Sequence, residues 1–324
     1  MKNILITGGA GYIGSHTVKE LLKENFNVIV YDNLSSGHRW AVLKPAKLVV
    51  GDLLDEKKLD SIFKKYKPEA VMNFAGSIEA GESMKRPGDF YKNNCLTSLN
   101  LLETVRKNKV KYFIFSSSAA VYGEPKKVPI KEDDLLLPIN TYGETKRVIE
   151  EMLKFYEGAY NIKSISLRYF NAAGADPGGL LGENHNPETH LVPLFLKAVL
   201  KDKPCYVFGN DYKTFDGTCI RDYIHVTDLA RAHILALKYL KKTHKSDIFN
   251  LGNGKGNSVL EVIKKIKEVT GINFKVKYLK RRIGDPDKLV ASSKKAEEVL
   301  KWKPQYNLEA IIKTAWGWKK NKIK

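Results

Sequence analysis

The chain has 324 residues, enough for one large domain or two medium ones, and its 43% hydrophobic content supports a sizeable core. The formal net charge of +19 would attract nucleic acid, but the lysines are dispersed among acidic residues without an aromatic-basic patch, so we expect no nucleic-acid partner. No apolar run reaches the ~18–20 residues of a membrane span, no signal peptide precedes the first strand, and three cysteines without a CxxC pair form neither a disulfide frame nor a metal site, so we expect a cytoplasmic protein with no membrane contact and no metal.

The first half of the chain alternates short apolar runs with helical patterns, which is typical of βαβ units and a parallel sheet. We expect strands at 4–7, 28–31, 48–50, 70–74, 112–116 and 164–168. Between them we expect helices near 13–24, 59–66, 90–107 and 145–160. This regularity ends after residue 173 in a glycine-rich loop, and a mixed segment with fewer strands follows. The pattern predicts an α/β chain with a doubly wound parallel sheet over 1–173 and a smaller, mixed α/β domain over 174–324, packed tightly on the first.

Three glycines at a spacing of three follow the first expected strand. Gly8, Gly11 and Gly14 stand between a strand and a helix, where the absence of side chains lets the backbone approach a pyrophosphate. The following helix offers free N–H groups and the positive end of its dipole. Asp32 ends the second strand, where a carboxylate can accept hydrogen bonds from a ribose diol and would repel a 2′-phosphate. The combination predicts a Rossmann-type site for NAD rather than NADP.

Two further strand ends fit the same site. Asp52, which follows the third strand, could reach an adenine amino group. The small residues after the fourth strand, in Phe74-Ala75-Gly76, would allow close contact with the cofactor.

A tyrosine and a lysine lie one helical turn apart later in the chain. Tyr142 and Lys146 would share one face of a helix, and a nearby cation lowers the pKa of a phenol from about 10 toward neutral pH. Ser118 ends the fifth strand, on the same rim of the sheet as the glycine loop. Beside a nicotinamide, these three groups suit the removal of an alcohol proton while hydride leaves the same carbon.

These motifs resemble the extended short-chain dehydrogenase/reductase superfamily. Over nearly its whole length the chain is similar to the UDP-glucose 4-epimerase family, in blocks such as Gly11-Tyr12-Ile13-Gly14-Ser15-His16, Leu167-Arg168-Tyr169-Phe170-Asn171 and Arg221-Asp222-Tyr223-Ile224-His225-Val226. The resemblance implies an NAD-dependent isomerase of galactose metabolism in which hydride leaves C4 of the sugar, the 4-keto sugar rotates, and hydride returns to its other face. Tyr142 would take the 4′-hydroxyl proton, Lys146 would hold the nicotinamide ribose and lower the pKa of the tyrosine, and Ser118 would hydrogen-bond the reacting oxygen.

The resemblance also implies the binding residues and the assembly. Besides the glycine loop and the three catalytic residues, the NAD site would comprise Tyr12, Ile13, Asp32, Asn33, Leu34, Ser35, Ser36, Gly37, Asp52, Leu53, Phe74, Ala75, Gly76, Ser77, Ile78, Asn93 and Phe170. The UDP-sugar would be held by Asn171, His190, Leu191, Tyr206, Val207, Phe208, Arg221, Arg282, Asp285 and Leu289, in addition to Ser118 and Tyr142. The two arginines can fork onto a diphosphate. A homodimer through the helices at 90–107 and 145–160 is also implied.

Three positions depart from the familiar pattern of this family. Ile78 stands where a lysine is frequent, and His190 replaces a common asparagine. Leu289 occupies a position thought to gate N-acetylated sugars, so a UDP-N-acetylhexosamine stays an alternative substrate. A 4-epimerase of UDP-uronic acids or UDP-pentoses is a separate alternative. A 4,6-dehydratase is disfavoured, because Ser118-Ala119-Ala120 lacks the required carboxylates. A non-catalytic NAD sensor is disfavoured, since serine, tyrosine and lysine are all present.

Overall fold

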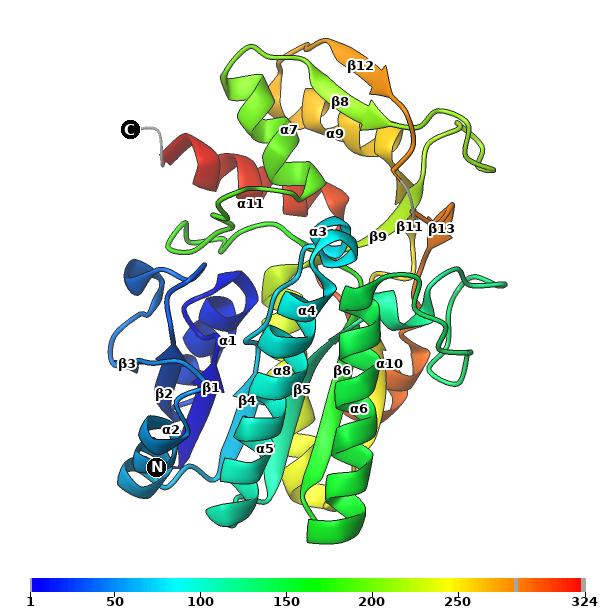
Figure 1. Ribbon diagram of the computed structural model, residues 1–324. Helices are drawn as coiled ribbons and strands as arrows, with labels where there is room; N and C mark the ends of the chain where they lie inside the picture. Colours follow the sequence, from blue (N-terminus) through cyan, green and yellow to red (C-terminus); the bar gives the residue numbers. More distant parts are fainter. Residues whose placement is uncertain (1, 283–284, 322–324) are drawn as a thin grey trace.

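A computed structural model describes residues 2–282 and 285–321, and within these ranges the largest element is a seven-stranded sheet (Figure 1). Its strands lie in the order β10-β6-β5-β4-β1-β2-β3, and every neighbouring pair is parallel. The strands are β1 (Asn3–Thr7), β2 (Asn27–Asp32), β3 (Lys47–Val50), β4 (Ala70–Asn73), β5 (Tyr112–Ser118), β6 (Lys163–Tyr169) and β10 (Asp247–Leu251). The strand order reverses between β1 and β4, and sheets of this kind bind ligands beyond the carboxyl ends of the strands at that point. The predicted α/β fold class is confirmed.

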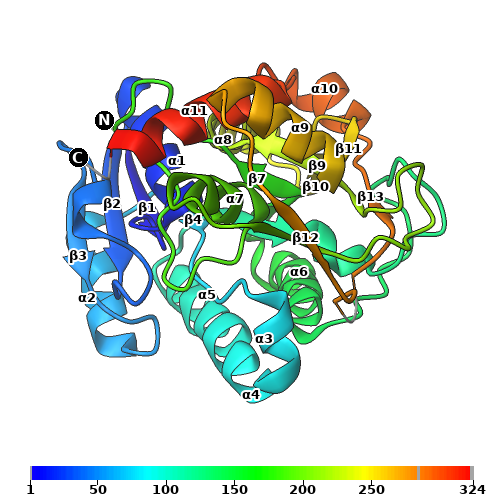
Figure 2. The same cartoon turned by 90° about the horizontal axis from the view of Figure 1, so that it is seen from above.

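Alternate residues of the central strand β1 enter two different hydrophobic cores. Ile4 and Ile6 belong to the core on one face of the sheet, and Leu5 belongs to the core on the other. Helices α1 (Tyr12–Lys23), α8 (Val226–Thr243) and α10 (Lys294–Leu300) cover the first face, whereas α2 (Glu56–Tyr66), α5 (Thr97–Lys107) and α6 (Thr141–Tyr160) cover the second (Figure 2). Because both faces are covered, these strands are continuous apolar runs in the sequence.

Side-chain caps explain where two helices begin. Asp55 caps α2, which starts three residues earlier than expected, and Asn140 caps α6, which starts four residues earlier. The helix expected over 90–107 is interrupted near its start by a π-helical turn. The short elements of this part of the chain are 3₁₀ turns at Arg39–Ala41 and Ala119–Tyr122, α3 (Ala80–Lys85), α4 (Pro87–Phe90) and the π turn at Tyr91–Leu96.

Short strands and three helices build a second body over one end of the large sheet (Figure 1). One small sheet has the order β11-β9-β13 with β7 also paired to β9, and β8 pairs with β12. The strands are β7 (Asn171–Ala173), β8 (Cys205–Phe208), β9 (Ile220–His225), β11 (Gly256–Ser258), β12 (Val276–Leu279) and β13 (Lys288–Leu289). The helices α7 (Leu191–Leu200), α9 (Val259–Thr270) and α11 (Leu308–Asn321) share a core that includes Val192, Val262 and Trp316.

The second half of the chain also contributes to the first body. Helix α8, strand β10 and helix α10 all follow residue 174, yet they complete the large sheet and one of its covering layers. The chain therefore crosses between the two bodies more than once, and we keep the division into 1–173 and 174–324 as a proposal. Among the described residues, no helix combines the length and apolar character that a bilayer crossing requires.

Candidate active site

The carboxyl ends of β1, β4 and β5 open into a cavity of about 490 Å³, which we call the large cavity because its wall extends over both bodies. Its wall contains the glycine loop, the start of α6 and residues of the second body. The predicted cofactor residues in the wall are Gly8, Gly11, Tyr12, Ile13, Gly14, Asp32, Asn33, Ser35, Ser36, Gly37, Asp52, Leu53, Phe74, Ala75, Gly76, Ser77, Ile78, Asn93 and Phe170. Leu34, although its backbone contacts Asp32, does not line the cavity.

The glycine loop leaves no room for side chains. Gly8 has φ +70°, and a Cβ there would lie 2.5 Å from the backbone nitrogen of Ala75. A Cβ on Gly14 would clash with the carbonyl oxygen of Gly8. Gly11 caps α1 without a side-chain hydrogen bond, so the first N–H groups of the helix stay available to an anion. The loop therefore fits the pyrophosphate of a dinucleotide.

Backbone N–H groups orient the acidic residue at the end of β2. The Asp32 carboxylate accepts from the N–H of Ala10 at 2.9 Å and from the N–H of Leu34 at 2.8 Å. Asp52 is held similarly, by the amide of Asn33 and the N–H of Leu54, each at 2.8 Å. Both carboxylates line the cavity and keep unused lone pairs, which suits hydrogen bonds from ribose and adenine.

Helix α6 begins at the cavity and carries two of the three predicted catalytic residues. Lys146 Nζ donates to the carbonyl oxygen of Ser116 at 2.8 Å and lies 5.7 Å from the centroid of the Tyr142 ring. The Ser118 hydroxyl accepts from the N–H of Ala120 at 3.1 Å and lies on the cavity wall beside Tyr142, whose pKa it lowers. The structure thus brings Ser118, Tyr142 and Lys146 together on one wall of the cavity.

Burial is the largest influence on the pKa values of this group. It raises the pKa of Tyr142, and the Ser118 side chain only partly opposes this shift. Burial also lowers the pKa of Lys146, to about 8. In this structure burial is the largest cause of the shift in the pKa of Tyr142, and Lys146 Nζ donates to the Ser116 carbonyl. That Lys146 lowers the pKa of Tyr142 stays a prediction.

Asn94 joins the cofactor wall to the catalytic helix, and sequence reasoning missed it. Its side chain accepts from the N–H of Ser77 at 2.7 Å and donates to the Thr145 hydroxyl at 2.9 Å. The π-helical turn directs Asn93 and Asn94 toward the same segment, since Asn93 donates to the Ser77 hydroxyl at 2.7 Å. Such turns are frequent at functional sites. In the sequence, the only indication of this role of Asn94 is its position next to Asn93, which was predicted to line the cofactor site.

The predicted UDP-sugar residues divide between two cavities. Asn171, His190, Leu191, Arg221, Asp285 and Leu289 line the large cavity. Tyr206, Val207, Phe208 and Arg282 line a neighbouring cavity of about 630 Å³, which also includes Leu191 and Asp285. Arg221 is buried and donates to Asp285 at 2.7 Å, whereas the Arg282 guanidinium lies 4.0 Å from the centroid of the Phe208 ring.

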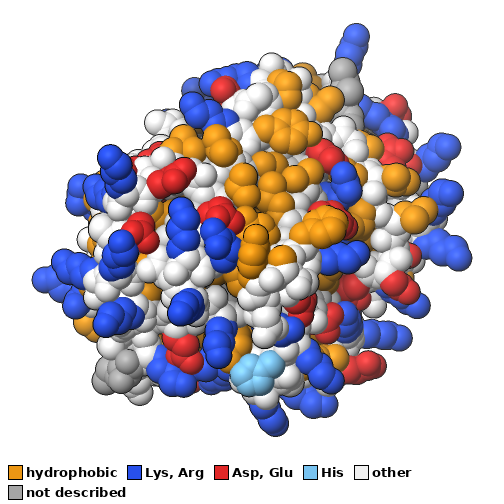
Figure 3. Space-filling view, turned by 60° about the horizontal axis from the view of Figure 1, so that its bottom comes forward, with side chains coloured by type: hydrophobic (Ala, Val, Ile, Leu, Met, Phe, Trp, Pro, Cys, Tyr) orange, Lys and Arg blue, Asp and Glu red, His pale blue; other side chains and the backbone are white. Residues whose placement is uncertain are grey.

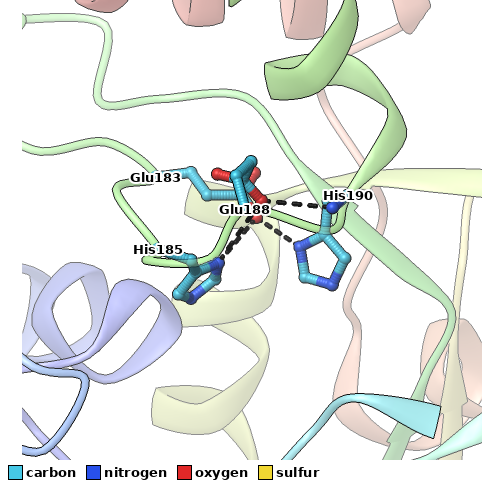
Figure 4. A group of neighbouring side chains, drawn as sticks. All are labelled: Glu183, His185, Glu188 and His190. Atoms are coloured by element: carbon cyan, nitrogen blue, oxygen red, sulfur yellow. Dashed lines mark hydrogen bonds and ion pairs between the residues drawn. The ribbon is translucent and has the colours of Figure 1, made fainter. Parts of the chain in front are cut away.

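His190 belongs to a cluster that the sequence analysis missed. Its Nδ1 contacts the buried carboxylate of Glu183, and His185 and Glu188 complete the group (Figure 4). The signal was the spacing Glu183-x-His185-x-x-Glu188-x-His190, which a search based on cysteines does not detect.

A parallel sheet with a glycine loop, an Asp at the end of its second strand and a Ser–Tyr–Lys group is typical of an NAD-dependent enzyme that acts on an alcohol carbon. Residues 4–252 match the model of the NAD dependent epimerase/dehydratase family, and the chain belongs to this family.

Named relatives are similar over almost the whole chain. A UDP-glucose 4-epimerase of Halalkalibacterium halodurans is 49% identical, over 98% of this chain and 95% of the relative. A solved UDP-glucose 4-epimerase of Brucella ovis in complex with NAD is 46% identical, with a TM-score of 0.94 and 98% of each chain covered. That of Bifidobacterium longum, in complex with NAD+ and UDP, is 36% identical, with a TM-score of 0.94 and coverage of 99% and 98%. The expectation of an NAD-dependent epimerase is confirmed.

Proposed function

We propose that this protein interconverts UDP-glucose and UDP-galactose at the large cavity. The observation that supports this most is the placement of Ser118, Tyr142 and Lys146 on the wall that also holds the glycine loop. When bound, NAD supplies the hydride acceptor and donor for C4 of the sugar. The names and ligands of the similar proteins point to the same substrate class.

In this proposal the side chains of the chain itself control the proton. Tyr142 takes the proton of the 4′-hydroxyl group and returns it after the sugar has turned. Ser118, which lines the same wall of the cavity as Tyr142, aligns the sugar oxygen with the phenol. Because burial raises the pKa of Tyr142, the phenolate needs a cation during the transfer, and Lys146 is the nearby one.

The second body would hold the uridine diphosphate. Arg221, on β9 of the second body, is a buried cation of the cavity wall, and its carboxylate partner Asp285 orients it. Leu191 and Asp285 line both cavities, so a nucleotide could extend from one into the other. Anchoring at the diphosphate leaves the sugar ring free to turn between its two faces.

The decisive experiment replaces the Tyr142 phenol and leaves its ring. Tyr142→Phe is expected to lose turnover of UDP-galactose by at least about 100-fold, since general base catalysis typically contributes 10²–10⁴-fold, while bound NAD is retained. Tyr156→Phe is the matched control: this residue also lies on α6, but its hydroxyl donates to Glu103. Near-wild-type activity of Tyr142→Phe would exclude the assigned base.

The identity of the preferred sugar is tested by measuring turnover of several UDP-sugars without added NAD. UDP-galactose is expected to turn over, and UDP-N-acetylgalactosamine and UDP-glucuronate serve as the competing candidates. Leu289 lines the large cavity. Leu289→Tyr is expected to reduce turnover of N-acetylated UDP-sugars more than turnover of UDP-galactose, because the larger ring narrows the cavity. Preferred turnover of another sugar would replace UDP-glucose in this proposal.

We also propose a homodimer through the outer faces of α5 and α6. Large hydrophobic side chains are exposed on and just before these helices, at Tyr91, Leu96, Leu99, Phe155 and Tyr160. Figure 3 shows hydrophobic side chains gathered into a patch on this side of the molecule. Exposed patches of this kind mark interaction surfaces.

Phe155 is the most exposed of these side chains, at 70%, and it supplies the test. Phe155→Glu is expected to shift the protein from dimer to monomer in sedimentation velocity. The matched control is Phe215→Glu, because Phe215 is 72% exposed but lies on a loop of the second body, away from α6. This variant is expected to leave the mass of the dimer unchanged. A wild-type monomer, or a dimer unaffected by Phe155→Glu, would contradict this interface.

The cytoplasm is the compartment that we propose. Cys95, Cys205 and Cys219 are all buried and free of disulfides. Unpaired cysteines are typical of a reducing compartment. Reactivity of all three toward an alkylating reagent after denaturation without reductant would agree with this, and fewer than three free thiols would contradict it.

A further inference from the structure

Four side chains of the loop before α7 converge on one point (Figure 4). Glu183, His185, Glu188 and His190 each place a ligand-capable atom within 4.8 Å of the others. His185 Nδ1 lies 3.2 Å from Glu183 Oε1 and 3.7 Å from Glu188 Oε1, and His190 Nδ1 contacts the same Glu183 oxygen. Both imidazoles therefore turn Nδ1 toward the two carboxylates.

The two carboxylate side chains of the cluster are buried, and one of their oxygens has no hydrogen-bond partner. The side chains of Glu183 and Glu188 are each only 4% exposed. Glu188 Oε1 accepts from the backbone N–H groups of Thr189 and His190, but Glu188 Oε2 has no hydrogen-bond partner. His185 Nδ1 contacts both carboxylates as an ion pair without the geometry of a hydrogen bond. Unpaired buried groups are costly, and each one in a folded protein calls for an explanation.

The two carboxylates of the cluster require positive charge close to them. Two carboxylates lie within a few ångströms of each other, and such a pair is unfavourable in a buried site without a positive charge. The ammonium group of Lys319 donates to the backbone carbonyl of Glu183 at 3.2 Å. Among the described residues it forms no ion pair with either carboxylate of the cluster. The two imidazoles supply that positive charge when they are protonated, and a metal ion that displaces their protons would supply it in their place.

We propose that Glu183, His185, Glu188 and His190 bind one divalent transition metal ion of the Zn²⁺ class. Two imidazole nitrogens and two carboxylate oxygens suit Zn²⁺, whereas Ca²⁺ and Mg²⁺ prefer oxygen ligands alone. Tetrahedral Zn²⁺ holds its ligand atoms at about 2.0–2.2 Å. Side-chain rotations that move these atoms by about an ångström bring them within that distance of one ion. The ion would join the two ends of an eight-residue loop, 183–190.

The position of the loop gives the ion a structural effect on the binding cavity. His185 and His190 line the large cavity, and Leu191, which begins α7, lines both cavities. The ring of His185 also packs edge-on against Tyr12 of the cofactor wall, with centroids 6.1 Å apart. With Nδ1 of His190 bound to the metal, only its other nitrogen is available to a ligand in the cavity. The metal thereby fixes the end of the cavity that the second body forms.

The test measures Zn²⁺ binding to the full-length protein with its NAD, after chelator treatment, by calorimetry and by metal analysis. One equivalent is expected for the wild type. Glu188→Gln keeps the size of the side chain, and His185→Ala removes one imidazole; each is expected to weaken binding by about 100-fold or more. His38→Ala is the matched control, because His38 bonds to the same loop through Asn184 but lies outside the cluster.

Co²⁺ identifies the ligands directly. A four-coordinate site of nitrogen and oxygen gives intense visible d–d bands without a thiolate charge-transfer band, which would instead indicate the cysteines. Unchanged circular dichroism of both variants shows that they are folded. Absence of stoichiometric binding to the wild type, binding unaffected by Glu188→Gln and His185→Ala, or a thiolate signature would each overturn the proposal.

Discussion

A buried ion pair holds the catalytic helix to the large sheet, and its removal tests how the site is supported. Arg168 on β6 is only 2% exposed, and its guanidinium donates to both oxygens of Glu150 on α6 at 2.6–3.2 Å. Glu150 follows Lys146 by one helical turn and also accepts from the Ser117 hydroxyl. Burial alone would lower the pKa of Arg168, but the bonds and charge of Glu150 outweigh it and raise the pKa. Arg168 therefore stays charged.

The perturbation is Glu150→Gln, which keeps the shape and removes the negative charge. Arg168 keeps its bonds to the Tyr122 hydroxyl and the Glu132 carbonyl, but its charge loses its only ionic partner among the described residues. Breaking one partner of a buried pair costs about 3–5 kcal/mol of unfolding free energy. The double variant Glu150→Leu with Arg168→Met is expected to lose less unfolding free energy than Glu150→Gln, since no charge of the pair remains buried.

Urea unfolding of the NAD-containing protein at one protein concentration measures this cost from the midpoint and the slope. Glu24→Gln is the control, because Glu24 and Lys238 form a pair that is about half exposed, and such pairs contribute about 0–1 kcal/mol. If Glu150→Gln destabilises the protein no more than Glu24→Gln does, the ion pair does not support α6 and the reasoning fails.

Three further changes address the binding and proton-transfer groups. Gly14→Ala is expected to lose most bound NAD, because its Cβ would meet the Gly8 carbonyl, and full NAD content measured after denaturation would contradict this. Asp32→Ala is expected to lower NAD content as well, through the lost ribose contact and the freed N–H of Ala10; unchanged content would argue against the ribose role. The pKa of Lys146 is lowered to about 8, so its ammonium is present below that pH, and a pH–rate profile is expected to fall as pH rises through about 8. A profile flat to pH 10 would show that the charge is not required.

Structural features that depend on neighbouring residues in the sequence were predicted well. Six of the seven strands of the large sheet, all except β10, appear where apolar runs indicated them, since burial on both faces requires such runs. The starts of α2 and α6 were expected too late, because the caps Asp55 and Asn140 extend each helix beyond its apolar pattern. The return of β10 to the large sheet involves pairing with β6, some eighty residues earlier, and no local pattern indicates that.

The sequence by itself determined the chemical groups and their local geometry: a glycine loop before a helix, an acid after a strand, and a tyrosine and a lysine one turn apart. These features depend on bond geometry within a few residues. The tertiary structure decided the rest. It buried Tyr142 so that its pKa rises, turned Lys146 toward Ser116, and gathered Glu183 with its two histidines. Solvation and electrostatic interaction depend on what surrounds a group in space, and distant segments of the chain supply those surroundings.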